Sequence, residues 1–383
     1  CPGERTRKRQ FLNDQQNHLS LIRRKALLIT YLMATFQITG QSKLSGKIKV
    51  AGNKNSVLAV MAASILTEET CILENVPNIS DVKTMAELIE LAGAKVEGVG
   101  SSSLTINCAN IRECHFPQEL TQKLRASVLL IAPMLARTGK VELGYPGGDI
   151  IGRRPLDTHF QVMESMGAKV EQSQDSFTVS CKSLTGTEIF LQEASVTATE
   201  NAIIAASVAE GVTVIKRAAA EPHVVDLCEF LIKMGVAING IGSSTISVNG
   251  IKKPQGATHS IRPDHIEVGT FAILAAVSQS KLEITPIIKD DLDMILLTLK
   301  KFNVKFEIKE DSLIVHPSGL KAVEKVVTDV WPGFATDLMA PMIVLASQAR
   351  GVTILHDWMY ESRMFFVDKL LSMGAKVDIS DPH

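Results

Sequence analysis

An internal repeat of about seventy residues is the feature of this sequence that most limits the folds open to it. Each copy has an amphipathic helical pattern that runs into a turn residue and then into a strand-like run. The turn residue is glycine in four copies and Asn303 in the other, and these two residue types best tolerate the left-handed conformation that ends a helix. The copies are TMAELIELAGAKVE (84–97), THFQVMESMGAKVE (158–171), DLCEFLIKMGVAIN (226–239), MILLTLKKFNVKFE (294–307) and FFVDKLLSMGAKVD (365–378). We therefore predict five copies of one α/β unit.

A second signature precedes each of these helices. An alanine-rich helical run leads into a β-branched strand, as in APMLARTGKVELGY and AASVAEGVTVIKRA. Each unit is thus close to strand, helix, strand, helix, strand, and we expect the helices to lie inside a shell of sheets. A linear solenoid is the alternative, but its repeat would be about 20–47 residues. The sequence ends after the strand of the fifth unit, at AKVDISDPH, so we expect the last repeat of a compact arrangement in threes to be missing.

The length and charge of the chain limit its domains and partners. A chain of 383 residues is expected to hold two domains, since single cores rarely grow past about 250–300 residues. Apolar residues make up 45% and charged residues 21%, which is ordinary for a soluble globular protein. The formal charge of −1 gives no general argument for a nucleic-acid or membrane partner. Anionic small molecules would have to be held by local arginines and lysines.

The cysteines and the N-terminal segment bear on compartment and processing. Six cysteines are scattered without a CxxC pair or zinc-ligand spacing, so we expect reduced thiols in a cytoplasmic protein with no metal and no cofactor; disulfides are the minor alternative. Residues 1–32 are strongly basic at their start, and their apolar run is shorter than the roughly 20 residues that span a bilayer. Met33 begins MATFQITGQSKLSGKIKVAG, which reads as a natural start. We expect residues 1–32 to be a non-native or disordered extension outside the fold.

The stretch LGYPGGDIIGRRPLDTHF (143–160) places an acid beside two cations. Asp149 follows Pro-Gly-Gly, and Arg153 and Arg154 come four and five residues later. The glycines favour a mobile loop, and Pro155 favours an extended conformation for Arg154. A solvated surface turn is the alternative reading of such a loop.

Other candidate phosphate-binding groups are found outside this loop. Lys54, in AGNKNS, is a mobile point charge suited to phosphate, and Asn55 can both donate and accept hydrogen bonds. Arg125, in KLRAS, offers a guanidinium fork that can hold two phosphate oxygens, as does Arg154. A solvent-facing turn is the alternative for the Lys54 segment.

Several motifs, in this order and in phase with the repeat, give the chain a family resemblance. From about Met33 to His383 it resembles the enolpyruvyl transferases. The resemblance implies a two-domain inside-out α/β barrel with its site in the cleft between domains, one domain formed by 33–53 plus 263–383 (incomplete) and the other by 54–262. The motifs are SGKIKVAGNKNS, KLRAS, PGGDIIGRRPLDTH, AAAEPHVVDL, RPDHIEVGTF, FATDLMAP and YESR.

The resemblance also implies a reaction. We expect transfer of the enolpyruvyl group of phosphoenolpyruvate to the 3′-hydroxyl of UDP-N-acetylglucosamine with release of phosphate, the first committed step of peptidoglycan synthesis. One alternative is a transferase of the same fold that acts on shikimate 3-phosphate, although that branch typically has Lys-Ser where this chain has Lys54-Asn55. Another is an inactive, truncated homologue that serves at most as a binding scaffold. Small molecules are the only partners implied.

Two acids carry the catalytic expectations that follow from the resemblance. Asp149 stands where many members have a cysteine that donates a proton and is alkylated by fosfomycin. An aspartic acid can donate a proton if the closed site favours its neutral form, but it offers no thiolate, so we expect fosfomycin resistance. Asp337, in FATDLMAP, is expected to be the general base, with a helix N-cap as an accompanying or alternative role. Lys54 is expected to take part in catalysis as well as binding.

The remaining expectations concern substrate contacts and departures from the family. Glu193 stands where lysine is frequent and Thr197 where glycine is common, and a glutamate beside a diphosphate would repel it. We expect structural roles for Glu221, Asp264 and Glu267, and a positioning role for His159. The resemblance assigns substrate contacts to Lys54, Asn55, Arg125, Arg154, Pro155, Leu156, Asp157, Thr158, Ser195, Val196, Asp337, Met359 and Arg363.

Overall fold

The structure, a computed structural model, describes residues 37–40, 44–149, 151–360 and 362–380. The expected N-terminal extension, residues 1–32, lies outside the described residues. All the elements below belong to one unit, Lys43–His383, which contains two large hydrophobic cores. We call the part around the first core, from Val57 to Ile261, the larger lobe. The part around the second, Val50 and Val268–Leu345, is the smaller lobe.

The larger lobe contains three four-stranded sheets with the same strand order. In each sheet a short strand pairs in parallel with a longer one, which pairs antiparallel with a third, and a fourth completes the edge. The first sheet is β13 (Thr258–Ser260), β2 (Thr70–Glu74), β4 (Ser103–Asn107) and β3 (Lys95–Glu97). The second is β5 (His115–Phe116), β6 (Lys140–Gly144), β8 (Ser176–Ser180) and β7 (Lys169–Gln172). The third is β9 (Glu188–Phe190), β10 (Val212–Lys216), β12 (Thr245–Asn249) and β11 (Ala237–Asn239).

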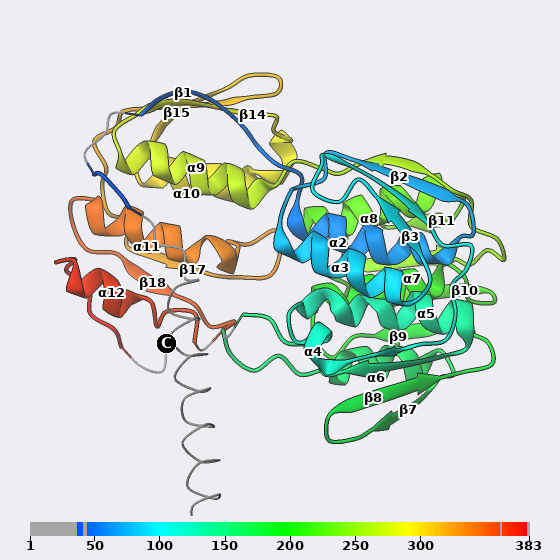
Figure 1. Cartoon of the computed structure of the whole chain (residues 1–383). Coiled ribbons are helices and arrows are strands. Elements are labelled where there is room, and N and C mark those ends of the chain that lie inside the picture. Colours follow the sequence, from blue (N-terminus) through cyan, green and yellow to red (C-terminus); the bar gives the residue numbers. More distant parts are fainter. Residues whose placement is uncertain (1–36, 41–43, 150, 361, 381–383) are drawn as a thin grey trace, which may run out of the picture. The chain divides into compact units, whose positions relative to one another are not determined.

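Two classes of helix lie within these sheets, as predicted (Figure 1). The alanine-rich helices are buried on nearly every side, with eight of ten residues buried in α2 and nine of eleven in α7, so they form the centre of the core. The helices that precede the repeated turns are buried on one face only, which suits a position beneath a sheet. The helices of this lobe are α2 (Lys54–Ala63), η1 (Ser64–Leu66), α3 (Ser80–Leu91), α4 (Gln118–Thr121), η2 (Arg125–Leu130), α5 (Ile131–Thr138), α6 (Asp157–Ser165), α7 (Val196–Ala206) and α8 (Pro222–Lys233).

The smaller lobe repeats the same unit. Its four-stranded sheet has the strand order of the larger lobe, and a two-stranded sheet follows it within the described residues. The first sheet is β1 (Ser45–Lys49), β14 (Lys281–Thr285), β16 (Leu313–His316) and β15 (Lys305–Ile308), and the second is β17 (Lys325–Val327) with β18 (Ile354–His356). The helices are α9 (His265–Val277), η3 (Lys289–Asp291), α10 (Asp293–Lys301), η4 (Thr336–Leu338), α11 (Met339–Gln348) and α12 (Val367–Ser372).

The repeated turns behave as the sequence predicts. Each turn residue has a positive φ, from 64° at Asn303 to 106° at Gly93, the left-handed conformation that stops a helix and starts the next strand. The five residues are Gly93, Gly167, Gly235, Asn303 and Gly374.

The chain passes between the lobes twice, and the two crossings are bonded to each other. The Asn53 N–H donates to Arg262 O at 2.8 Å, and the Asp264 N–H donates to Ala51 O at 2.9 Å. Gly52 lies between them, where a Cβ would come within 1.9 Å of the Asn75 carbonyl oxygen, so only glycine fits. The crossings therefore hold the start of α2 beside the start of α9.

Candidate active site

The loop that carries Asp149 lies against Arg125. The Gly147 N–H donates to Thr121 O at 3.2 Å, and a Cβ on Gly147 would lie 2.0 Å from Gln122 O. Gly148 has φ +108°, and a Cβ there would meet the Arg125 side chain at 2.9 Å. These glycines thus allow the loop to lie close to Arg125, and the exposed Asp149 follows directly after Gly148.

Arg125 and Arg154 form a paired cation site. The Arg125 guanidinium donates from Nη2 to Arg154 O at 2.6 Å and to Pro155 O at 3.4 Å. Burial lowers the pKa of Arg125 to about 10, and repulsion from Arg154 acts in the same direction. Two cations that are held together without a matching number of acids favour an anionic ligand.

A second cluster in the smaller lobe joins Asp337 and Arg363. Arg363 Nη2 lies 2.9 Å from Asp337 Oδ1, and Arg363 is mostly buried whereas Asp337 is half exposed. The Asp337 segment, η4, rests against α9 at Gly269, where a Cβ would meet Leu338 at 2.9 Å. The alternative role of Asp337 as a helix N-cap is wrong, because its side chain makes no capping bond to η4 or α11.

Asp357 organises this second cluster and was missed by sequence reasoning. It is buried and accepts hydrogen bonds from Thr336 Oγ1 at 2.5 Å, Thr328 Oγ1 at 3.0 Å and the Met359 N–H at 3.0 Å. Its Oδ2 also lies 3.9 Å from Arg363 Nε. The buried carboxylate of Asp357 thus holds three groups in place: the side chain of Thr336, which precedes Asp337, the backbone of Met359 and the guanidinium of Arg363. An acid directly after a strand was the available signal.

Tyr360 lies among charged groups of both clusters. The Arg363 guanidinium carbon is 5.1 Å from the centre of its ring, a cation–π contact. Burial raises the pKa of Tyr360; Asp337 and Glu193 act in the same direction, while Arg154 and Arg363 oppose them. These charges come from both lobes.

A backbone contact also joins the two clusters. The Ser362 N–H donates to Ile151 O at 3.0 Å, so the loop after Asp149 touches the segment that carries Arg363. The structure therefore brings the arginine pair, the Asp149 loop and the Asp337 cluster into one neighbourhood.

His159, in the first turn of α6, contacts two residues of α7. It is buried, its Nε2 lies 3.1 Å from Thr197 Oγ1, and its Nδ1 lies 2.9 Å from Asn201 Nδ2. Burial lowers the pKa of His159 to about 3, with a contribution from Arg125. The hydroxyl of Thr197 thus bonds to a neutral imidazole that joins α6 to α7.

The start of α7 and the start of α6 carry further predicted contacts. Ser195 is the N-cap of α7 and accepts from the Ala198 N–H at 3.4 Å, and Val196 is the first helical residue. Leu156 and Thr158 are buried, whereas Pro155 and Asp157 are exposed at the start of α6. Glu193 is exposed close enough to act on Arg125, which places a carboxylate beside the paired cations.

Lys54 and Asn55 make contacts that are separate from those of the two clusters. They open α2 beside the crossings, and Lys54 Nζ lies 3.7 Å from Asp81 Oδ2 with both side chains partly exposed. The structure gives Lys54 no direct contact with Arg125, Arg154 or Arg363 among the described residues.

The three acids expected to be structural have different roles. Asp264 caps α9, accepting from Ile266 N–H at 2.9 Å, and Glu267 Oε2 accepts from the Ala51 N–H at 2.7 Å, so the structural reading of both is confirmed. Glu221 differs, because one of its carboxylate oxygens is buried without a hydrogen-bond partner among the residues that the structure describes. Burial raises the pKa of Glu221, and Asp337 contributes to the rise, so this acid belongs to the surroundings of the site.

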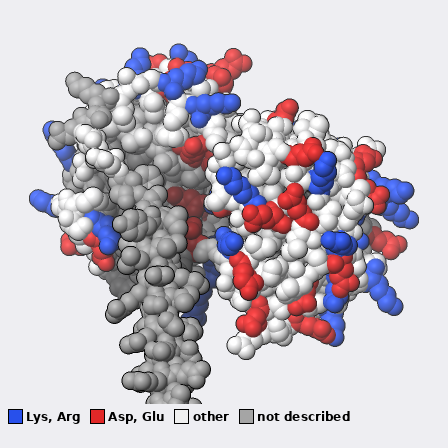
Figure 2. All heavy atoms as spheres, viewed as in Figure 1, with Lys and Arg blue, Asp and Glu red and all other residues white. Residues whose placement is uncertain are grey.

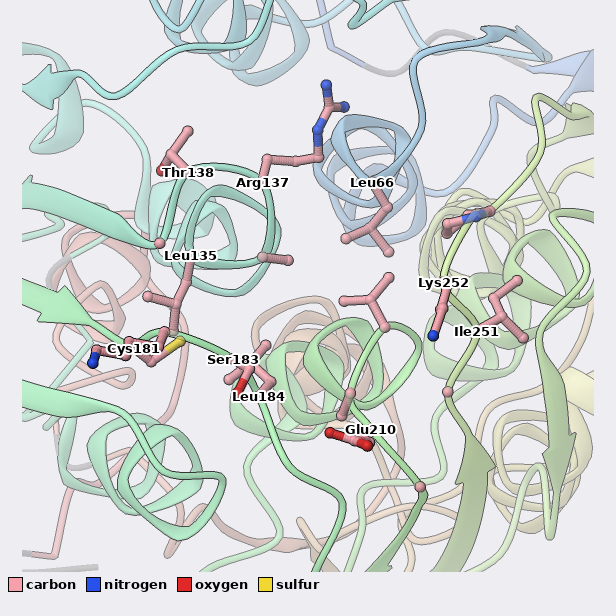
Figure 3. A pocket seen from close by; sticks show the side chains of 18 residues that line it. Leu66, Leu135, Arg137, Thr138, Cys181, Ser183, Leu184, Glu210, Ile251 and Lys252 are labelled. Carbon is pink, nitrogen blue, oxygen red and sulfur yellow. The ribbon is translucent and has the colours of Figure 1, made fainter.

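A pocket of about 680 Å³ lies apart from these residues (Figure 3). It is lined by the ends of the inner helices of the larger lobe, and Arg137 at its edge donates to Ile65 O at 2.7 Å and to Cys108 O at 3.1 Å. None of the predicted site residues lines it. Arg137 serves there as an internal cap for neighbouring carbonyls.

Surface charge, possible metal ligands and possible membrane-spanning helices add three observations. Figure 2 shows basic and acidic side chains interspersed over the visible face of the larger lobe, so an anion would be held by local groups such as Arg125 and Arg154. In the ranges that the structure describes, no group of three or more His, Cys, Asp or Glu side chains is placed to hold a metal ion. None of the described helices is both long and apolar enough to cross a membrane.

Comparison with known proteins gives consistent matches over nearly the whole chain. The family model described as EPSP synthase (3-phosphoshikimate 1-carboxyvinyltransferase) matches residues 38–382. The UDP-N-acetylglucosamine 1-carboxyvinyltransferase of Treponema denticola is 43% identical over 359 residues, which is 92% of this chain and 84% of that relative. The protein of the same name from Bradyrhizobium diazoefficiens is 45% identical over 90% of this chain and 82% of that relative.

Solved structures agree on the fold. The enolpyruvyl transferase NikO from Streptomyces tendae superimposes with a TM-score of 0.80 at 22% identity, covering 90% of this chain and 82% of that one. An EPSP synthase from Acinetobacter baumannii gives a TM-score of 0.64 at 17% identity, covering 83% and 74%. The predicted fold class, an inside-out α/β arrangement of repeated units, is confirmed. The chain is a transferase. It belongs to the enolpyruvyl (carboxyvinyl) transferase family, in the group of the UDP-N-acetylglucosamine 1-carboxyvinyltransferases.

Proposed function

We propose that the chain transfers the enolpyruvyl group of phosphoenolpyruvate to the 3′-hydroxyl of UDP-N-acetylglucosamine and releases phosphate. The observation that carries this proposal is identity above 40% to relatives of that name over about nine-tenths of the chain. The meeting of an arginine pair, an exposed acid and an acid–arginine pair within one neighbourhood supports it. In this role the protein would start peptidoglycan synthesis, and through it support cell-wall growth, cell shape and cell division.

The arginines and Lys54 are suited to the anionic parts of the substrates. Arg125 and Arg154 would hold phosphate oxygens, because the two cations lie close enough to repel each other and a guanidinium fork can hold two phosphate oxygens. Arg363, oriented by Asp357 and Tyr360, would hold the carboxylate of phosphoenolpyruvate. Lys54 and Asn55 would contact phosphoenolpyruvate from the start of α2.

The two acids would divide the proton transfers. Asp149 gives a proton to C3 of phosphoenolpyruvate, which makes C2 electrophilic, while Asp337 takes the proton of the attacking 3′-hydroxyl as the new C2–O bond forms. In the second step C3 returns its proton to Asp149, the C2–O bond to phosphate breaks, and inorganic phosphate leaves with the proton that Asp337 had taken. Each acid ends the cycle as it began. The half-exposed position of Asp337 and the exposed position of Asp149 leave both accessible to substrate.

The remaining substrate contacts are proposed for residues around the nucleotide sugar. The N-terminus of α7 offers backbone N–H groups suited to the UDP moiety, and the Met359 backbone is fixed by Asp357. These contacts are assigned to Pro155, Leu156, Asp157, Thr158, Ser195, Val196 and Met359.

The domain boundaries and the compartment are also proposed. The paired crossings and the two hydrophobic cores support one domain of 54–262 and another of 33–53 plus 263–383. We place the protein in the cytoplasm because Cys71, Cys108, Cys114, Cys181 and Cys228 are free thiols.

Acceptor choice tests the proposal. Phosphate release from phosphoenolpyruvate is measured with UDP-N-acetylglucosamine and, separately, with shikimate 3-phosphate. We expect release only with the nucleotide sugar. Release only with shikimate 3-phosphate would move the chain to the other branch of the family, and no release with either acceptor would leave the binding-scaffold alternative.

Fosfomycin tests the chemistry of the loop. We expect no time-dependent inactivation of the wild-type enzyme, because Asp149 has no sulfur to alkylate. Asp149→Cys should become sensitive and gain the mass of the drug, measured on the intact protein. Covalent inactivation of the wild type would contradict this assignment.

A further inference from the structure

The first turn of α2 is held by two residues of the crossings. Asn53 Oδ1 accepts from the Asn55 N–H at 2.9 Å and the Ser56 N–H at 3.0 Å. Asp264 Oδ2 accepts from the Lys54 N–H at 3.3 Å. The three N–H groups that open the helix are therefore satisfied by side chains, and these side chains determine where Lys54 and Asn55 point.

The orientation of Asn53 is set by one imidazole. Because Oδ1 faces the two backbone N–H groups, Nδ2 faces the other way, where it lies 3.4 Å from His265 Nδ1. Nδ2 can only donate, so Nδ1 must accept, and His265 must be neutral with its proton on Nε2. Both residues are buried, with 3% and 4% of their surfaces exposed.

The ring of His265 is fixed by two aromatic neighbours. His223, at the start of α8, stacks on it with ring centres 6.4 Å apart and planes 18° apart. Trp331 meets it edge-on, with centres 5.7 Å apart. These two contacts hold the plane of the His265 ring beside Asn53.

We propose that His265 is a positioning residue for Lys54 and Asn55, which it holds in place through the side-chain amide of Asn53. This inference rests on the proposed function in one respect: Lys54 and Asn55 would be held in place so that they can bind phosphoenolpyruvate. The structural link itself, from His265 through Asn53 to the first turn of α2, does not depend on it.

The link has a definite pH dependence. The charged and titratable groups facing His265 are Asp264 at its own cap, Asp337 on η4, Arg262 on the crossing and His223 on α8. Burial lowers the pKa of His265 below its ordinary value of about 6.5, although Asp264 and Asp337 oppose this. The neutral acceptor is therefore fully present above about pH 6.5 and is lost as pH falls through the folded pKa below it. Protonation puts two donors face to face, and Asn53 cannot turn over without releasing α2.

Amide hydrogen exchange of the full chain tests the link without requiring turnover. Protection factors of the Asn55 and Ser56 amides are measured from pH 8 downward through the folded pKa of His265, which lies below its ordinary value. In the wild type we expect protection to fall as the pH drops through that pKa. His265→Phe keeps the ring contacts but has no acceptor, so its protection should be about five- to tenfold lower at pH 8. His265→Gln keeps a neutral acceptor, so its protection should be high and independent of pH.

Two further variants keep the test decisive. Asn53→Ser can still cap α2, but its side chain is too short to reach His265, so it should keep protection and lose the pH dependence. This variant answers the question if His265→Phe does not fold. His115→Gln, an exposed histidine in β5, is the matched control and should behave as the wild type.

Steady-state kinetics extend the test to function. We expect His265→Phe to raise the KM for phosphoenolpyruvate about five- to tenfold with a much smaller change in kcat, and His265→Gln to flatten the acid side of the kcat/KM profile. Equal protection of Asn55 and Ser56 in wild type and His265→Phe at pH 8 would overturn the inference. A wild type that shows the exchange pattern but no turnover would count against the proposed function alone.

Discussion

The two lobes are built from the same repeated unit but differ in how fully their apolar faces are covered. In the larger lobe three four-stranded sheets surround helices that are buried on nearly every side. In the smaller lobe the last described unit has a two-stranded sheet, and it exposes 87% of Val352, 72% of Phe365 and 73% of Met373. The same sequence pattern therefore gives closed packing in one lobe and a bare apolar edge in the other.

This difference shows which contacts position the site. The Arg125 guanidinium is bonded to the carbonyls of Arg154 and Pro155 in the closed lobe, where buried His159 joins α6 to α7. Asp337 and Arg363 border the bare edge, yet they are tied to the second core by Gly269 and by the buried carboxylate of Asp357. Both halves of the site thus depend on well-packed segments.

The largest expected effect on activity comes from replacing either of the two proposed catalytic acids, one in each lobe. Asp337→Asn and Asp149→Asn should each lower kcat by roughly 10²–10⁴-fold, because each removes one proton-transfer group. Asp368→Asn, an exposed acid at the start of α12, is the control and should leave kcat unchanged. If Asp337→Asn keeps more than a tenth of wild-type kcat, its role as base is wrong.

A pair of phenylalanine truncations measures the contrast in packing. Phe230→Ala, in the closed lobe where the side chain is fully buried, should lower the free energy of unfolding by about 3–5 kcal/mol. Phe365→Ala, at the bare edge, should change it by less than about 0.5 kcal/mol. Urea unfolding of the two variants gives both values, and equal losses would mean that Phe365 is covered in solution.

The smallest expected effect concerns the charge beside the arginine pair. Glu193→Gln should lower the KM for UDP-N-acetylglucosamine a few-fold, since an exposed like charge is worth about 1 kcal/mol or less. The gain should shrink as salt is added. Glu164→Gln, an exposed acid of α6, is the control. An unchanged or raised KM in Glu193→Gln at low salt would show that Glu193 does not repel the diphosphate.

The fold was largely predictable because its information is local. Helix periodicity and the left-handed turns at Gly93, Gly167, Gly235, Asn303 and Gly374 lie within short windows of sequence. Because these windows repeat five times, the pattern as a whole predicted the α/β unit even though each copy alone is a weak indication.

The site was less predictable because its contacts join distant segments. Asp357 binds Thr328 and Thr336, and Tyr360 meets charges from both lobes; no short motif encodes either contact. The alternative role of Asp337 as a helix N-cap was wrong for the same reason, since a tertiary partner, Arg363, takes its carboxylate. The contact between His265 and Asn53 was not predicted, because the two residues lie more than two hundred positions apart in the sequence.

Exchange of the C3 hydrogens of phosphoenolpyruvate with solvent tests most directly whether the two lobes share one active site. In deuterium oxide with both substrates, we predict that the methylene group of the product gains deuterium, because C3 is protonated and then deprotonated during each transfer. Asp149→Asn and Asp337→Asn should both lose this incorporation. Deuterium in the product of Asp149→Asn at the wild-type level, or phosphate release with no incorporation in the wild type, would contradict it.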